Sequence, residues 1–307
     1  MGFLHPSDKT ARVKVAMGTS ADPPSIAVDP KVVAAPVLPM PSPGPALRDY
    51  ALAELDAAVE ALAQPGDDIH EGIHRARKGL RRVRATLALG DGILGPGVAL
   101  LDREIKHLNT GLSALRDAHA LVETLERMHK RARKGDTRQL FDLARAEAIA
   151  ARMATAEVEL SMDPTLCQRR GLIEVLMAAV PALDWQRLTP SAARMALTDS
   201  DDRSQKARDT ALQKGRDSDW HRWRRRARRA SQQRRALEAV GVSVPASEPQ
   251  VFDKRTTERL GEAQDLSLLL DHCGKGSPFS KERRRALRSY AEPALVRLRK
   301  RISTVRR

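Results

Sequence analysis

Two stretches of the chain place histidine and arginine at spacings suited to binding an anion. The first, His74–Arg84, reads HRARKGLRRVR and carries six cationic side chains without an acid. The second, His221–Arg235, carries eight arginines, again without an acid. Like charges one helical turn apart cost a helix roughly 0.2–0.5 kcal/mol per pair. Because a guanidinium grips phosphate oxygens through two parallel hydrogen bonds, these stretches favour a phosphate-binding surface over an ordinary solvated face.

Helical periodicity gathers these charges on one side of each stretch. At about 100° per residue, the first stretch has a cationic side and an apolar side that includes Ile73, Leu80 and Val83. The cationic side holds His74, Arg77, Lys78, Arg81, Arg82 and Arg84. The second stretch repeats the pattern, with Trp223, Ala227 and Ala230 behind its charges. Its cationic side holds His221, Arg224, Arg225, Arg228 and Arg229. Two amphipathic helices must therefore position the candidate site.

The distribution of charge supports a polyanionic partner. The chain of 307 residues has a formal net charge of +15. The two stretches and the C-terminal segment 281–307 together carry +23, so the remainder of the chain is mildly acidic. Such a concentration of positive charge favours nucleic acid, an acidic membrane surface or a phosphate polymer as the partner.

Composition and periodicity predict an all-α fold. Ala, Leu, Arg and Glu dominate, aromatic residues make up only 3% of the chain, and two-residue alternation is rare. Residues 1–45 hold nine of the eighteen prolines and are expected to form an extended, disordered arm. Helices are predicted at about 46–64, 68–89, 97–132, 137–161, 164–180, 190–214, 217–240, 247–273 and 279–305.

An internal repeat relates the two halves of this helical region. His74 precedes Asp117 by 43 residues, and His221 precedes Asp265 by 44. The sequences around each pair are similar, so the chain is predicted to contain a duplication with halves at 46–162 and 163–307. Two similar halves that pack together form a pseudo-two-fold arrangement with paired sites at the shared interface.

These motifs resemble the conserved histidine α-helical domain, or CHAD, family. The first half reads H-x-x-R-K-x-x-R-R-x-R from His74, followed by L-x-x-L-R-D at Leu112–Asp117. The second reads H-x-x-R-R-x-x-R-R from His221, followed by L-G-x-x-Q-D at Leu260–Asp265. Ser231 stands where the pattern has a final arginine, and Gln264 where asparagine is common, so the second half is expected to grip its ligand less tightly there.

The resemblance implies two four-helix bundles related by pseudo-two-fold symmetry, with a basic channel or cavity between them. It also implies binding of inorganic polyphosphate and a cytoplasmic location at polyphosphate granules. The implied ligand-facing residues are the cationic sides of both stretches, with Lys106, Arg116 and Lys254 added. Asp117 and Asp265 are expected to orient basic side chains as structural struts, because a half-buried carboxylate needs a partner.

No catalytic residue, metal ligand or cofactor is predicted. His74 and His221 lie within cationic stripes and are interpreted as anion ligands, not nucleophiles. The run Asp271-His272-Cys273 offers metal-binding residue types, but three adjacent residues project from a helix in different directions. The chain also lacks a P-loop and the E-x-E-x-K strand motif of tunnel-type triphosphatases.

The alternative partner is a nucleic acid. The charge permits it, and Trp220 and Trp223 flank His221. Against it, aromatic residues for base stacking are few, and no helix-turn-helix, RRM, KH or zinc-finger signature is present. The two cysteines form no disulfide framework, and no apolar stretch approaches the roughly 20 residues of a membrane span.

Overall fold

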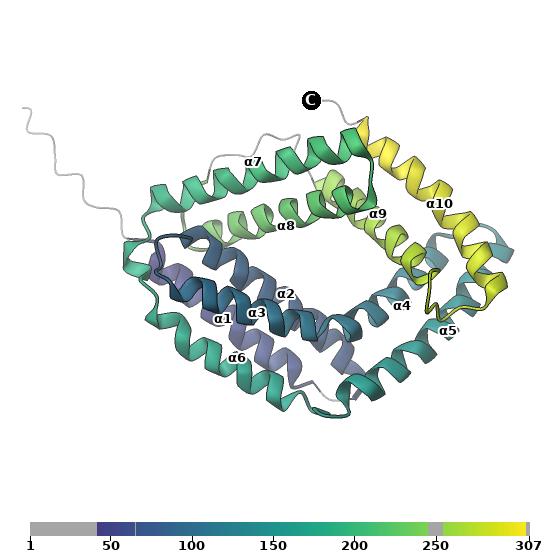
Figure 1. The fold of residues 1–307 in the computed structure, drawn as a ribbon, viewed down its shortest axis with the longest axis horizontal. Helices are drawn as coiled ribbons and strands as arrows, with labels where there is room; N and C mark the ends of the chain where they lie inside the picture. The colour runs from purple at the N-terminus through teal and green to yellow at the C-terminus, as the bar shows by residue number, and fades with distance from the viewer. Residues whose placement is uncertain (1–41, 65, 245–253, 305–307) are drawn as a thin grey trace, which may run out of the picture. The chain divides into compact units, whose positions relative to one another are not determined.

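A computed structural model describes residues 42–64, 66–244 and 254–304 (Figure 1). The all-α prediction is confirmed for this part of the chain, which contains helices and no strand. Most of the predicted arm, and residues 247–253 of the predicted ninth helix, lie outside the described residues. The helices are α1 (Gly44–Leu62), α2 (Ile69–Leu87), α3 (Gly97–Gly111), α4 (Ser113–Arg131), α5 (Gly135–Leu160), α6 (Cys167–Ala179), α7 (Pro190–Lys214), α8 (Asp217–Ala239), α9 (Lys254–His272) and α10 (Lys281–Ser303).

One predicted helix is divided in two. The sequence pattern over 97–132 predicts a single helix, but the backbone leaves the helical conformation at Leu112 (φ −94°, ψ 6°). Gly111, immediately before the break, is the poorest helix former apart from proline. The Leu112 side chain is fully buried, so the bend between α3 and α4 keeps an apolar anchor in the core. The division gives α4 a direction of its own.

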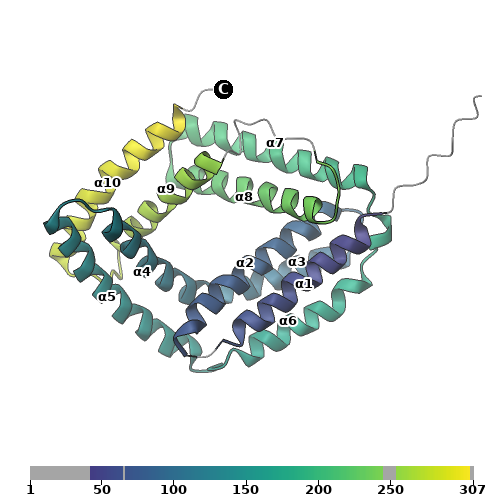
Figure 2. The same cartoon turned by 180° about the vertical axis from the view of Figure 1, so that it is seen from behind.

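Consecutive helices pack as four hairpins, α1–α2, α4–α5, α7–α8 and α9–α10 (Figures 1 and 2). Two glycines of α2 allow the first hairpin to close tightly. A Cβ atom at Gly72 would lie 2.1 Å from the carbonyl oxygen of Ala61, and one at Gly79 would lie 2.8 Å from that of Glu54. Because both neighbours are backbone atoms of α1, only glycine permits this approach.

The buried residues form two hydrophobic clusters, and each draws on both halves of the sequence. The first joins α1, α2 and α3 to α6 and to parts of α7 and α8. The second joins α4 and α5 to α9 and α10 and to other parts of α7 and α8, including Trp223. The clusters therefore do not separate at residue 162, and the division into bundles at 46–162 and 163–307 stays a prediction.

The apolar sides predicted for the two basic helices are confirmed. In α2, Ile73, Leu80 and Val83 are fully buried. In α8, Trp223 and Ala230 are 1% exposed. The cationic side chains are therefore held on the opposite side of each helix by well-packed anchors. The pseudo-two-fold relation between the halves stays a prediction.

Candidate functional site

The cationic sides of α2 and α8 lie against each other. The two helices are in contact (Figures 1 and 2), and the charges of Arg224 and Arg228 act directly on Arg81. Arg116 of α4 acts on all three of these residues. With Arg77 of α2, these residues form what we call the arginine cluster, which is Arg77, Arg81, Arg116, Arg224 and Arg228.

Burial and neighbouring positive charges disfavour the charged form of four of the cluster's arginines, Arg77, Arg81, Arg224 and Arg228. Burial, followed by the charge of Arg228, lowers the pKa of Arg81 to about 9. The same two causes lower the pKa of Arg224 to about 10, against an opposing effect of Asp265. Burial, and then the charge of Arg116, also lowers the pKa of Arg228. Five cations thus share a partly desolvated space, which is unfavourable unless an anion joins them.

Most of the cluster lacks a counterion. Within the described residues, Arg81, Arg224 and Arg228 make no ion pair, and Arg116 lies 3.6 Å from Glu123. Several of the buried N–H groups also have no hydrogen-bond acceptor, including the Nε atoms of Arg77 and Arg81 and an Nη atom of Arg116. A buried donor left without an acceptor costs about 1–3 kcal/mol. An anion with several oxygen atoms would satisfy these groups together.

A cavity of about 360 Å³ opens beside the arginine cluster. It is lined almost entirely by guanidinium groups from both basic helices, with no acid among the lining residues. Those residues are Arg81, Arg84, Ala85, Arg222, Arg225, Arg226, Arg228, Arg229 and Gln232. Arg222 and Arg226 were not among the predicted site residues because they fall outside the H-x-x-R-R-x-x-R-R spacing. Their place in the eight-arginine run was the signal that could have included them.

A second cavity, of about 520 Å³, shares Arg222 and Arg225 with the first. It holds His221, whose Nδ1 lies 2.8 Å from the amide oxygen of Gln264. Three aspartates, Asp117, Asp217 and Asp271, also line this cavity. Its mixed charge suits phosphate less well than the first cavity does, so the stronger anion site is the one beside Arg81.

The structure places two predicted site residues in an ion pair or in hydrogen bonds with neutral groups. Arg84 donates two hydrogen bonds to Asp102 of α3, at 2.8 and 2.9 Å, although it also lines the first cavity. Arg77 donates to the backbone oxygen of Asn109 and, at 2.9 Å, to Ser113 Oγ. These contacts hold two cationic side chains in place at the edge of the site.

Other predicted residues lie outside the cluster. Lys78 and Lys106 are exposed and make no ion pair in the described part of the chain. Lys254 begins α9, and its side chain is not among those described. Arg229 lines the first cavity, where burial lowers its pKa against the opposing charge of Asp102.

Arg82 turns away from the site towards α1. Its guanidinium lies 2.7 Å from Glu54, and both side chains are less than a quarter exposed. We expect Arg82→Gln to lower the free energy of unfolding by about 1–3 kcal/mol, because Glu54, only 14% exposed, loses its ion-pair partner. Polyphosphate affinity should fall far less than in Arg81→Gln, the same exchange one residue earlier. Denaturant unfolding and a binding titration of both variants check this, and equal losses of affinity would contradict it.

The two predicted struts lie in different surroundings. Asp265 accepts a hydrogen bond from Arg127 of α4 at 2.9 Å, which links α9 to α4. Asp117 is exposed, and its charge favours the protonated forms of Arg77 and His272. Both carboxylates therefore stand beside basic side chains, while their role in ligand binding stays a prediction.

His74 lies between the cluster and two carboxylates. Burial, and then the charge of Arg116, lowers its pKa, while Glu123 and Glu71 oppose this shift. Its Nδ1 is buried without a hydrogen-bond partner. The ring is therefore neutral at pH 7 in the free protein, and a bound anion would favour its protonation.

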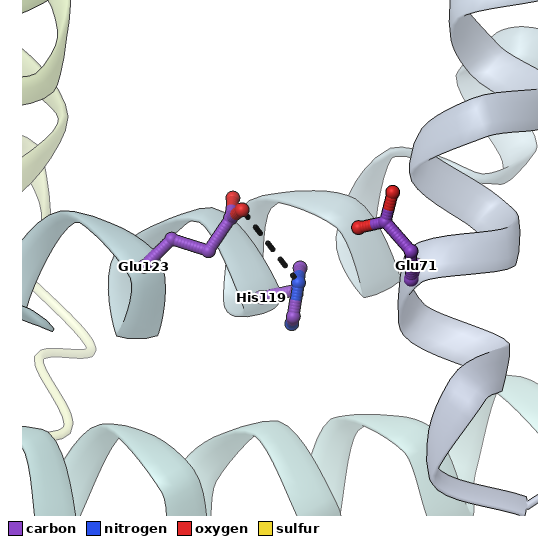
Figure 3. Close-up of side chains that lie close together, drawn as sticks. All are labelled: Glu71, His119 and Glu123. Carbon is purple, nitrogen blue, oxygen red and sulfur yellow. Dashed lines mark ion pairs between the residues drawn. The ribbon is translucent and has the colours of Figure 1, made fainter.

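Three described side chains lie close enough together to hold a metal ion, and none of the three was among the predicted site residues. Glu71 of α2 and His119 and Glu123 of α4 place one ligand atom each within 4.8 Å of the others (Figure 3). Two guanidinium groups already face this group. Arg116 lies 3.6 Å from Glu123, and Arg152 lies 3.4 Å from Nδ1 of His119.

The described chain is all-α, and arginines of two basic helices line a common cavity. The model of the CHAD domain family matches residues 46–274, which is most of the chain, so the protein belongs to the CHAD domain family. No curated protein matches the chain. Among the described helices, none combines the length and apolar composition needed to cross a bilayer.

Two solved structures have a similar fold. The crystal structure of the CHAD domain from the plant Ricinus communis matches with a TM-score of 0.56 and 23% identity, over 87% of this chain and 93% of that one. PptA from Streptomyces chartreusis matches with a TM-score of 0.59 and 19% identity, over 87% of this chain and 99% of that one. At these identities the likeness concerns the fold alone.

Proposed function

We propose that this protein binds inorganic polyphosphate between α2 and α8. The observation that carries the proposal is the meeting of two arginine faces whose central members have no counterion within the described residues. Polyphosphate is a flexible chain with roughly one negative charge per phosphate and no bases. It needs convergent cations and no aromatic platform, which matches a cavity lined by guanidinium groups. The CHAD family resemblance favours the same ligand.

Nucleic acid fits this site less well. Trp220 and Trp223 are only 7% and 1% exposed, so neither is available for stacking with a base. The two rings instead contact each other, and the guanidinium of Arg299 lies 5.4 Å from the Trp220 ring. Direct reading of bases in a single strand depends on exposed aromatic faces. A polymer recognised through its phosphates alone therefore suits the site better.

The test is a binding titration of the full chain against polyphosphates of graded length. Affinity should rise with chain length until the ligand fills the site and then level off. It should also fall steeply with salt, because each neutralised phosphate releases a condensed counterion. Duplex DNA and RNA are the competitors, at equal phosphate concentration. If either displaces long-chain polyphosphate, the preference for polyphosphate is contradicted.

We also propose that the protein binds polyphosphate without hydrolysing it, and that binding places it at cytoplasmic polyphosphate granules. The site offers the arginine cluster and the neighbouring ring of His74, and no carboxylate lines the first cavity to activate water. Incubating the chain with polyphosphate and Mg²⁺ should release no phosphate above the protein-free rate. Fluorescent fusions of the wild type and of Arg81→Glu test the location, since only the wild type should concentrate on granules.

A further inference from the structure

Arg116 occupies the centre of the arginine cluster. Its charge acts on His74, Arg77, Arg81, Arg224 and Arg228, which come from both basic helices. Arg116 itself comes from α4, which packs on α2 and on α9. Its guanidinium therefore adds positive charge from a third helix beside the two basic helices. No other residue of the cluster acts on so many of its neighbours.

Arg116 is also the one member of the cluster with a nearby carboxylate as an ion-pair partner. Its Nη2 lies 3.6 Å from Oε2 of Glu123, two turns later on the same face of α4. The other oxygen of Glu123 lies 3.9 Å from Nε2 of His119 (Figure 3). Both side chains of the Arg116–Glu123 pair are between a fifth and a third exposed. Glu123 therefore stands where a phosphate oxygen would compete with it for Arg116.

The second half of the chain lacks this arrangement. At the 148-residue offset of the duplication, Gln264 corresponds to Arg116 and Asp271 corresponds to Glu123. Gln264 lies 2.8 Å from His221 instead of holding a carboxylate. Both halves have an acidic residue at this position, Glu123 and Asp271. Only the first half has an arginine, Arg116, to pair with it. Within the arginine cluster, a carboxylate pairs with Arg116 alone among the described residues.

We propose that Glu123 is an internal counterion that competes with polyphosphate for Arg116, so that binding transfers Arg116 from the carboxylate to the ligand. This inference rests on the proposed function and concerns a residue pair that sets the affinity for polyphosphate. Glu123 acts through Arg116 and is a positioning residue. On release it remains beside His119, with Glu71 and Arg152 as the other charged groups facing that ring.

The same geometry explains why these carboxylates serve a guanidinium better than a metal ion. Arg152 lies 3.4 Å from Nδ1 of His119, so a neutral ring that accepts from it carries its proton on Nε2, the nitrogen facing Glu123. A metal ligand at that nitrogen would need the opposite tautomer. Arg116 and Arg152 already supply two positive charges beside the two carboxylates.

The test is polyphosphate affinity in Glu123→Gln, measured by titration of the full chain at fixed salt. Affinity should rise about two- to fivefold, the range expected when a competing ion pair of this exposure is removed. The matched control is Glu126→Gln, which removes the same charge from α4, where Glu126 pairs with Lys130 at 2.9 Å. The control should change affinity by much less. Equal gains in both variants would reduce the effect to net charge and overturn the proposal.

A double-mutant cycle with Arg116→Gln separates competition from a structural role. The gain in polyphosphate affinity from Glu123→Gln should vanish when Arg116 is already replaced, because the Glu123 carboxylate then has no arginine for which to compete. Thermal unfolding of each variant shows whether the fold is kept. A gain that persists without Arg116, or a loss of affinity in Glu123→Gln, would overturn the inference. Failure of the wild type to bind polyphosphate would instead overturn the proposed function.

Discussion

Arg81→Glu and Arg228→Glu are each expected to weaken binding of long-chain polyphosphate by more than about tenfold, because each removes a charge-assisted hydrogen bond worth about 1.5–3 kcal/mol and adds repulsion. Arg81 belongs to α2 and Arg228 to α8, so the two variants probe opposite sides of the site. Their helical content, followed by circular dichroism, should stay unchanged.

The matched control for both reversals is Arg133→Glu. Arg133 is exposed in the link between α4 and α5. Its replacement by glutamate changes the net charge of the chain by the same amount as the two reversals. If binding depends only on net charge, all three variants lose affinity equally, and the site between α2 and α8 is excluded. Loss in Arg81→Glu and Arg228→Glu alone locates the ligand between the two basic helices.

Arg81→Met is expected to raise the free energy of unfolding by about 1 kcal/mol or more while it weakens polyphosphate binding. The Arg81 side chain is partly buried near Arg77, Arg224 and Arg228, makes no ion pair in the described chain and has a pKa lowered to about 9, chiefly by burial. Methionine keeps the packing of the side chain and removes the cost of burying an unpaired charge. Stability and function should therefore change in opposite directions.

Denaturant unfolding without ligand measures the first effect, and a titration measures the second. Arg103→Met serves as the control, since Arg103 is 60% exposed and lies beside Glu104. Its unfolding free energy should move by no more than about 0.5 kcal/mol. If Arg81→Met destabilises the protein as a core substitution would, the arginine is a structural residue and the cluster was not built for a ligand.

The sequence was sufficient to predict the features that depend on local periodicity. The stripe of His74, Arg77 and Arg81 follows from residue spacing on one helix, and so does the apolar side that fixes its direction. The same holds for Arg224 and Arg228 on α8. The helical fold class followed from composition and from the lack of alternating patterns.

Features that depend on neighbouring helices could not be predicted. The pairing of Arg82 with Glu54 requires the closeness of α1 and α2 that Gly79 permits. The partner of Arg84, Asp102, was hidden until α3 was placed. A helical wheel places Arg82 and Arg84 on the same side of α2 as Arg81. Helix packing nevertheless gives Arg82 and Arg84 different acidic partners.

The way the halves combine was also beyond local reasoning. The duplication predicted two similar sets of helices, but the repeat alone does not say which hairpins share a core. The first cluster joins α1, α2, α3 and α6 to parts of α7 and α8, and the second joins α4 and α5 to α9, α10 and other parts of α7 and α8. Packing between the two halves brings the basic helices α2 and α8 into contact. It also places Arg116 of α4 near arginines of both helices.

The most direct test of the central claim is an experimental structure of this chain with a short linear polyphosphate. We predict phosphate density between α2 and α8, with oxygen atoms within hydrogen-bonding distance of Arg81 and Arg228. Arg116 should have turned from Glu123 to the ligand. Polyphosphate bound only elsewhere, for example along the basic surface of α10, with the arginine cluster unchanged, would contradict it.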